Sequence, residues 1–158
     1  MGGKRQLRFD GPALYAALDE QRQARELSWH ELAGQIGVAD STIRNTRNGG
    51  PMETDGILAM LRWLKRRPED FNRGAKQSLA STPLPLKFGR LNTVALYEAL
   101  DATRRCRGLT WSALAVEIGG VSPSMLTHLS RGGRAEISLV VAVAAYLGRD
   151  VLSFTRAK

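Results

Sequence analysis

Apolar side chains recur at helical spacing along most of this chain. In the first such segment, Leu14, Ala17 and Leu18 share one face of a helix that we expect from about residue 12 to residue 25. Asp10 has a suitable side chain and position to cap its first turn. The segment is therefore an amphipathic helix whose apolar face needs a partner.

Capping residues and glycines divide the residues that follow into short helices. Ser28 precedes Glu31 by three residues, the spacing of a capping box, and predicts a second helix that ends at Gly37. Two further helices are expected at about 40–47 and 54–65, with Gly49 and Gly50 between them and a last turn at 68–71. The pattern predicts a compact, all-helical unit.

The whole pattern occurs twice. Residues 13–37 align without a gap to residues 95–119, and 14 of the 25 pairs are identical. After one inserted glycine, Gly120, the match continues as far as Phe71 on Phe154. A period of about 82 residues is too long for a solenoid unit. We therefore expect two small domains, residues 1–72 with a basic N-terminal arm and residues 90–158, joined by a flexible linker at 73–89.

The two copies differ in how their helices are expected to begin and end. Gly108 can end the first helix of the second copy in a left-handed conformation, whereas Glu26 stands at that place in the first copy and predicts a different or strained cap. Thr110 is the expected cap of the next helix. The remaining helices of the second copy are expected at about 122–130 and 138–147, with a last turn at 150–154.

Charge and cysteine content narrow the class of protein. Lys and Arg exceed Asp and Glu by 23 to 15, which favours a polyanionic partner such as nucleic acid. The sequence shows no apolar run long enough for a membrane span and no signal peptide, so we expect no membrane partner. Cys106, the single cysteine, is expected to be a buried small side chain in a reducing cytoplasm, with a redox sensor as the other interpretation.

The second and third helices of each copy form the pattern that carries function. Two short helices joined by a tight turn need apolar residues where they face each other, a small residue where they approach and glycine at the bend. The first copy supplies Leu32, Ala33, Ile36, Gly37, Val38 and Ile43, and the second supplies Leu114, Ala115, Ile118, Gly119, Val121 and Leu126. A helical bundle of any purpose uses such residues, but two matches in the same context are a stronger signal.

The segments LSWHELAGQIGVADSTI and LTWSALAVEIGGVSPSML resemble the Cro-like phage-repressor helix-turn-helix family, also called the XRE family. The resemblance covers residues 9–72 and 91–155. It implies an all-α fold of two tandem five-helix, lambda-repressor-like domains. It also implies that the third helix of each domain reads base edges in the DNA major groove, while the start of the second helix touches backbone phosphates.

Carried onto this sequence, the resemblance assigns two sets of DNA contacts. The base-reading positions are Asp40, Ser41, Arg44, Asn45, Ser124, Thr127 and His128. Arg suits guanine and Asn suits adenine in bidentate geometry, whereas a carboxylate near phosphates is repelled unless it caps a helix or accepts from cytosine. The expected phosphate or arm contacts are Trp29, Asn48, Trp111, Arg131, Arg134, Lys4, Arg5, Arg8, Lys87 and Arg90. A core role for the tryptophans and a solvated tail for the basic arms remain the alternative interpretations.

Several positions depart from the family pattern. A buried Arg–Glu pair between the first and third helices is usual, but Arg22 would face Arg47 and Arg104 would face Ser130. Both Arg22 and Arg104 are therefore available for phosphates or for other partners. Thr46 stands where Leu129 occupies the second copy, and Gly120 lengthens the second turn, which can tilt that recognition helix.

We expect a DNA-binding regulator, with a repressor as the favoured form, and not an enzyme. The sequence contains no metal-ligand cluster, nucleophile elbow, phosphate loop or dinucleotide fingerprint, and no cofactor is expected. Double-stranded DNA is the expected partner, and a monomeric pseudo-dimer is favoured over a homodimer. In the competing hypothesis one copy binds DNA and the other is a dimerisation or partner-binding module, as in an antitoxin or a phage regulator.

Overall fold

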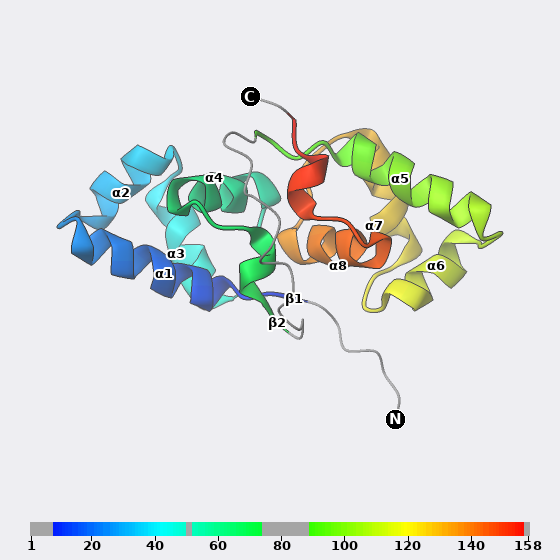
Figure 1. The fold of residues 1–158 in the computed structure, drawn as a ribbon, viewed down its shortest axis with the longest axis horizontal. Helices are drawn as coiled ribbons and strands as arrows, with labels where there is room; N and C mark the ends of the chain where they lie inside the picture. Colours follow the sequence, from blue (N-terminus) through cyan, green and yellow to red (C-terminus); the bar gives the residue numbers. More distant parts are fainter. Residues whose placement is uncertain (1–7, 50–51, 74–88, 157–158) are drawn as a thin grey trace.

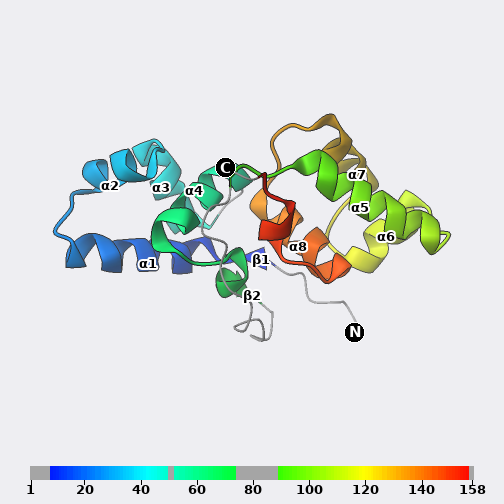
Figure 2. The ribbon, with the colours of Figure 1, turned by 45° about the horizontal axis from the view of Figure 1, so that its top comes forward.

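The computed structural model describes residues 8–49, 52–73 and 89–156. In these residues the chain forms two helical lobes that lie side by side along the long axis of the molecule (Figure 1; Figure 2). The first half contains β1 (Arg8–Phe9), α1 (Gly11–Ala24), α2 (Trp29–Ile36), α3 (Asp40–Asn48), α4 (Thr54–Leu64), the 3₁₀ helix η1 (Pro68–Phe71) and β2 (Asn72–Arg73). The second contains α5 (Thr93–Cys106), α6 (Trp111–Ile118), α7 (Pro123–His128), η2 (Leu129–Arg131), α8 (Ile137–Leu147) and η3 (Val151–Phe154).

The predicted all-α class is confirmed for these residues, with β1 and β2 forming one short antiparallel pair. Each half has four α-helices, and the expected fifth element is a single 3₁₀ turn of four residues, η1 or η3. Both turns bury a phenylalanine, Phe71 or Phe154, against the core. The last element of each repeat is therefore held by burial of its aromatic side chain.

The predicted caps are present. The hydroxyl of Ser28 accepts from the N–H of Glu31 at 3.0 Å, and the carboxylate of Glu31 accepts from the N–H of Ser28 at 2.8 Å. Thr110 caps α6 in the same manner, without the return bond. Glu26 has φ +55° at the position where Gly108 has φ +66°, so the first copy places a strained residue where the second uses glycine.

The prediction for Cys106 is wrong, because its side chain is exposed. Leu96 and Leu100 lie on the buried face of α5, and Cys106 is the last residue of that helix, beyond the apolar stripe. Its counterpart in the first half, Ala24, is also exposed. A small side chain at this place has no core to enter.

Gly11 is required by the close approach of α1 to the end of α3. A Cβ added at Gly11 would lie 2.6 Å from the carbonyl oxygen of Thr46 and 2.9 Å from Cε of Met52. The backbone oxygen cannot move away without disturbing the last turn of α3. The two helices therefore pack at a distance that only glycine permits in this half.

We expect Gly11→Ala to lower the free energy of unfolding by about 1–3 kcal/mol, because it overpacks this contact. Gly34→Ala is the matched control: Gly34 lies on α2 with no atom within 4 Å of a Cβ. Removing a helical glycine there should stabilise the protein by about 0.5–1 kcal/mol. Denaturant unfolding of both variants measures the difference, and equal effects would contradict the packing argument.

Positions related by the repeat meet where the two halves touch. Glu53 and Glu136, which are equivalent in the two copies, form an antiparallel bridge. The N–H of Thr54 donates to Ala135 at 2.9 Å, and the N–H of Ile137 donates to Met52 at 2.8 Å. In the repeat, Met52 corresponds to Ala135 and Thr54 to Ile137, so exchanging the two halves turns one of these hydrogen bonds into the other. The contact therefore has an approximate two-fold axis through the bridge.

Side-chain bonds follow the same symmetry. The N–H of Leu91 donates to Asp55 at 2.9 Å, and the N–H of Phe9 donates to Ser138 at 3.3 Å. In the repeat Phe9 corresponds to Leu91 and Asp55 to Ser138. The start of α4 therefore accepts a bond from one of the first residues of the second half, and the start of α8 accepts one from the first half.

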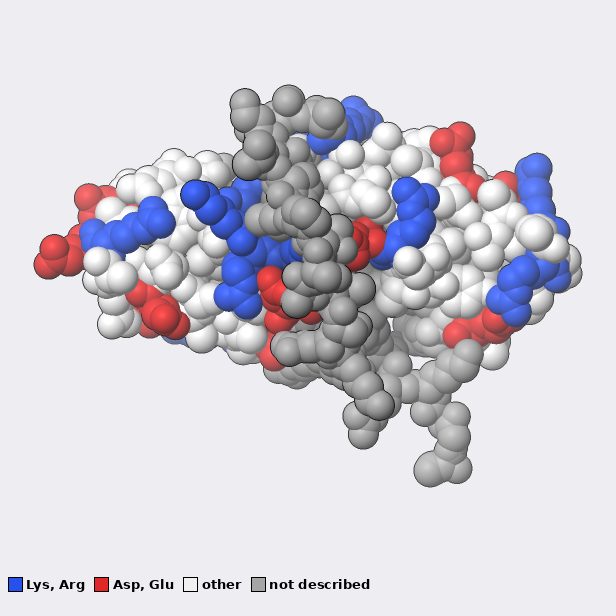
Figure 3. Space-filling model, in the orientation of Figure 1, with Lys and Arg blue, Asp and Glu red and all other residues white. Residues whose placement is uncertain are grey.

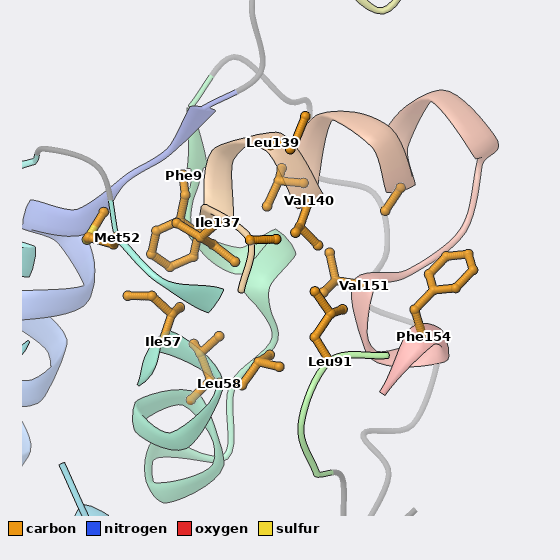
Figure 4. Close-up of a cluster of buried hydrophobic side chains, with 14 of the residues drawn as sticks. Phe9, Met52, Ile57, Leu58, Leu91, Ile137, Leu139, Val140, Val151 and Phe154 are labelled. Carbon is orange, nitrogen blue, oxygen red and sulfur yellow. The ribbon is translucent and has the colours of Figure 1, made fainter. Parts of the chain in front are cut away.

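Apolar residues fill the space around the axis. Figure 4 shows Phe9, Ile57 and Leu58 of the first half near Ile137 and Val140 of the second. These side chains belong to one continuous buried cluster that includes residues of both halves. The two halves share a core, a contact that the hydrophobic pattern of the sequence did not predict.

Residues 73 and 89, the two ends of the predicted linker, make backbone contacts with the folded halves. Asn72 and Arg73 pair with Phe9 and Arg8, and the N–H of Gly89 donates to Arg156 at 2.8 Å. Residues 73 and 89 are therefore part of the folded halves, and residues 74–88 lie outside the described residues. The spacing between the halves is set by their interface, where the sequence suggested that the linker sets it.

Glu69 is a half-buried acid at this interface. Its Oε2 accepts from the N–H of Val151 at 2.9 Å, while no group in the described residues donates to its Oε1. Burial raises the pKa of Glu69 above its ordinary value, and the nearby carboxylate of Asp150 acts in the same direction. Ionised Glu69 therefore costs the folded state free energy.

A raised pKa in the folded state means that stability is fully present below the ordinary pKa of a glutamate and is lost as the pH rises through the folded value. We expect Glu69→Gln, which keeps an acceptor for Val151, to gain stability relative to the wild type as the pH rises from about 4 to about 7, by on the order of 1 kcal/mol. Exposed Glu20 supplies the control, Glu20→Gln, which makes the same substitution on the surface. Urea unfolding at both pH values tests this, and a pH-independent effect of Glu69→Gln would contradict it.

Candidate nucleic-acid interface

Helices α2 and α3 meet through the residues that the sequence singled out. Leu32, Ala33 and Ile43 are buried between them. Gly37 ends α2 at φ +90°, a left-handed conformation, and Val38 packs against the core in the turn. This packing fixes which side of α3 faces solvent.

The exposed side of α3 is polar, as the helical spacing predicted. Ser41, Arg44, Asn45 and Asn48 are exposed, on the side opposite Ile43. Asp40 is half-buried, and its Oδ2 lies 3.4 Å from Nδ1 of His30. The side chain of Asp40 does not cap the helix, because Ala39 is the cap and makes no side-chain bond.

A cavity of about 190 Å³ lies beside this surface, between α1, α2 and α3. It is lined by Tyr15, Trp29, Asp40, Ile43, Arg44 and Arg47. The guanidinium of Arg47 lies 5.8 Å from the ring centre of Tyr15. Arg47 thus joins Arg44 in giving this surface positive charge, although the sequence analysis named Arg47 only as the residue that faces Arg22 where the usual Arg–Glu pair is absent.

The corresponding surface of the second half carries fewer charges. Ser124 and His128 are exposed on α7, and Thr127 is half-buried with its hydroxyl donating to the carbonyl of Ser124 at 3.3 Å. Met125, beside them, is 39% exposed. The sequence did not predict this exposure, because a methionine at helical spacing is usually a core residue. The two surfaces are equivalent in position and different in chemistry.

Gly120 changes the turn before α7. Gly119 and Gly120 both have positive φ, +86° and +71°, where the first half uses Gly37 alone. The α-helix then runs for six residues and continues as the 3₁₀ turn η2. Thr46 and Leu129, which differ between the copies, are both buried, and the hydroxyl of Thr46 donates to the carbonyl of Ile43 at 2.6 Å.

Trp29 and Trp111 are half-buried, and each stacks on a tyrosine of the preceding helix. Trp29 lies 4.8 Å from Tyr15 and Trp111 lies 5.4 Å from Tyr97, measured between ring centres. These contacts support the structural interpretation of the tryptophans. They also leave part of each ring accessible at the start of α2 or α6.

Arg22 and Arg104 have partners elsewhere, one of the two outcomes that the sequence left open. Arg22 bonds Asp19 at 2.7 Å, donates to the carbonyl of Leu27 at 2.9 Å and covers the ring of Trp29 at 4.5 Å. Arg104 repeats every one of these contacts in the second half, with Asp101, Leu109 and Trp111. Both arginines tie the end of the first helix of their half to the second helix.

The basic lead-in segments are only partly described. Lys4, Arg5 and Lys87 lie outside the described residues, and only the backbone of Arg8 is described, in β1. Arg90 is 83% exposed and lies 3.8 Å from Asp55 across the interface. Because β1 is paired and Phe9 is buried, residues 8 and 9 do not form a free arm.

The remaining predicted contacts lie near the ends of α3 and α7. Asn48 and Arg131 are exposed at equivalent positions. Arg134 is 85% exposed and lies 3.8 Å from Glu53, next to the two-fold axis. On the face drawn in Figure 3, basic and acidic side chains are interspersed over both halves and form no continuous basic patch in the described part.

The approximate two-fold axis relates α3 to α7. Asn48 is five residues before Glu53, and Arg131 is five residues before Glu136. At about 3.5 Å per residue and about 5 Å across the bridge, Asn48 at the end of α3 and Arg131 at the end of η2, which follows α7, are at most about 40 Å apart. The symmetry also places both helices at the same level along the axis.

Other kinds of site find no support in the described residues. No three side chains of the types that ligate metals gather there, and no described helix reaches the length and apolarity of a bilayer span. Comparison with family models, with curated proteins and with solved structures found no match to this chain. Its function must be argued from its own residues.

Proposed function

We propose that this chain is a sequence-specific DNA-binding regulator, with a repressor as the favoured form, of the tandem helix-turn-helix type. In this proposal α3 and α7 are recognition helices that enter successive major grooves, and the chain acts as a covalent pseudo-dimer. The supporting observation is the two-fold arrangement of two exposed polar helices, each packed on a preceding helix through a glycine turn.

The geometry suits duplex DNA. Recognition helices of such dimers lie about 34 Å apart, one helical turn of the duplex. The limit of about 40 Å between Asn48 and Arg131, which follows from the short connections to the bridge, is compatible with this distance. Because the halves share a core, the spacing of the two helices is fixed before DNA binds, which spares the cost of ordering them on the DNA.

The two recognition surfaces differ, so we expect two dissimilar half-sites. Arg44 and Asn45 offer bidentate donors and acceptors for guanine and adenine. Ser124, Thr127 and His128 offer single polar groups, and Met125 adds an apolar side chain suited to a thymine methyl group. The first half is therefore expected to contribute more to sequence discrimination.

One observation favours the second hypothesis, in which the second half binds a protein partner. Val116 on α6 is 78% exposed, and Met125 on α7 is exposed as well, whereas the first half has Gly34 and Thr42 at these positions. Exposed apolar side chains on a surface with few cations are more typical of protein contacts than of DNA contacts.

Selection of bound duplexes from a random pool tests the proposal. We expect two different half-sites at one fixed separation, and one chain per site. With about 6–10 phosphate contacts, affinity should fall about 10³- to 10⁵-fold between 50 and 200 mM salt. Failure to enrich any sequence would contradict DNA recognition, and a single half-site would favour the second hypothesis.

Arg44→Ala should cost about 1–3 kcal/mol of binding free energy on the selected site and relax the preference at one base position. The matched control is Arg149→Ala, because exposed Arg149 follows α8 in the chain, is not part of α3 or α7, and lies over Phe154. That variant removes the same charge and should leave the preferred sequence unchanged. Titration of both variants on matched and mismatched duplexes separates base reading from general attraction.

A further inference from the structure

The interface between the halves is symmetric in its backbone and asymmetric in its charges. Arg67 and Asp150 occupy equivalent positions of the repeat, each directly before the 3₁₀ turn that ends in Phe71 or Phe154. Nη1 of Arg67 lies 3.3 Å from Oδ2 of Asp150, and the two side chains are 10% and 25% exposed. An ion pair thus joins two positions that the symmetry would make identical.

This placement has a consequence for pairing. Two first halves brought together through the same contact would oppose Arg67 to a second Arg67. Two second halves would oppose Asp150 to a second Asp150. Like charges at a mostly buried position are strongly unfavourable, so each charge favours the other half as partner.

A hydrogen bond next to the ion pair discriminates in the same direction. The N–H of Val151 donates to Glu69, and the repeat equivalents of these residues are Pro68 and Leu152. Pro68 has no N–H and Leu152 has no side-chain acceptor. Two first halves would leave Glu69 opposite a residue that cannot donate, and two second halves would leave the N–H of Val151 opposite a leucine.

Most other contacts across the axis serve any combination of halves. The backbone bonds around Glu53 and Glu136 need no particular side chain. Asp55 and Ser138 both accept the N–H that faces them. Asp70 is bonded to Arg66 and to the N–H of Arg67 within its own half. The ion pairs of Arg90 with Asp55 and of Arg134 with Glu53 also join the two halves, but both span 3.8 Å and their arginines are 83% and 85% exposed, so they contribute little. Discrimination therefore falls mainly on Arg67, Asp150, Glu69 and Val151.

We infer that this interface is heterotypic: each half is built to pair with the other half and to reject a copy of itself. The backbone bonds at the axis would join any two halves. The ion pair and the hydrogen bond beside them make the contact selective for one half of each kind. In the wild-type protein, the two complementary halves belong to the same chain and pair with each other. Two chains can combine through this surface only by exchanging halves. The inference concerns pairing alone and does not depend on DNA binding.

Charge reversal in the full chain tests the inference. Arg67→Asp places two acids at the axis within one chain, and Asp150→Arg places two arginines there. When the two variants are mixed and refolded together, complementary pairs form only between chains. We expect the mass to rise from 17.3 kDa to about twice that value, with about ten-fold more dimer than either variant forms alone. The double variant R67D/D150R should return to one chain and recover the thermal stability that each single variant loses.

Arg66→Asp provides the matched control, because the ion pair of Arg66 is with Asp70 of its own half. Mixed with Asp150→Arg, it should form no exchanged dimer. The inference is overturned if the mixture of Arg67→Asp and Asp150→Arg stays monomeric, or if either of them dimerises alone to the same extent. It is also overturned if the double variant is no more stable than the single ones, and this comparison applies even where a single variant folds poorly.

Discussion

The antiparallel bridge between Glu53 and Glu136 is the contact around which the molecule is arranged. It joins the short segments that precede α4 and α8, and the repeat relates its two backbone hydrogen bonds to each other. A small helical unit of this length buries too little apolar surface to be more than marginally stable by itself. By docking through the bridge, the two halves add their apolar faces to one cluster and gain a larger core than either has alone.

This contact also relates the two exposed polar helices, α3 and α7, by an approximate two-fold axis. A single exposed helix with Ser41, Arg44 and Asn45 is what many soluble proteins show. Two such helices related by a two-fold axis, with connections to the bridge that allow a separation of about one helical turn of DNA, form an arrangement that a duplex can match. The proposal of DNA binding therefore rests more on the relation between the halves than on any one side chain.

Duplication explains both the likeness and the differences of the halves. The contacts of Arg22 with Asp19, Leu27 and Trp29 recur around Arg104, because they hold each helical unit together. Several of the positions that differ lie on the outward surface of α7 and at the axis, where Arg67 meets Asp150. Internal packing constrains the copies to remain alike, whereas surfaces that meet something else are free to diverge.

The sequence by itself determined the helices, their caps and the polar side of α3. Periodicity, the capping box at Ser28 and the left-handed position at Glu26 are local features, encoded within a few residues and therefore readable without a structure. Only the tertiary structure decided that Cys106 is exposed, that Arg22 bonds Asp19, and that Asp40 lies beside His30. It also decided that the halves dock, because the apolar residues at the axis, such as Ile57 and Val140, have the same spacing as residues packed within one unit. Helical spacing tells which side of a helix is buried, but not whether the buried side meets its own half or the other one.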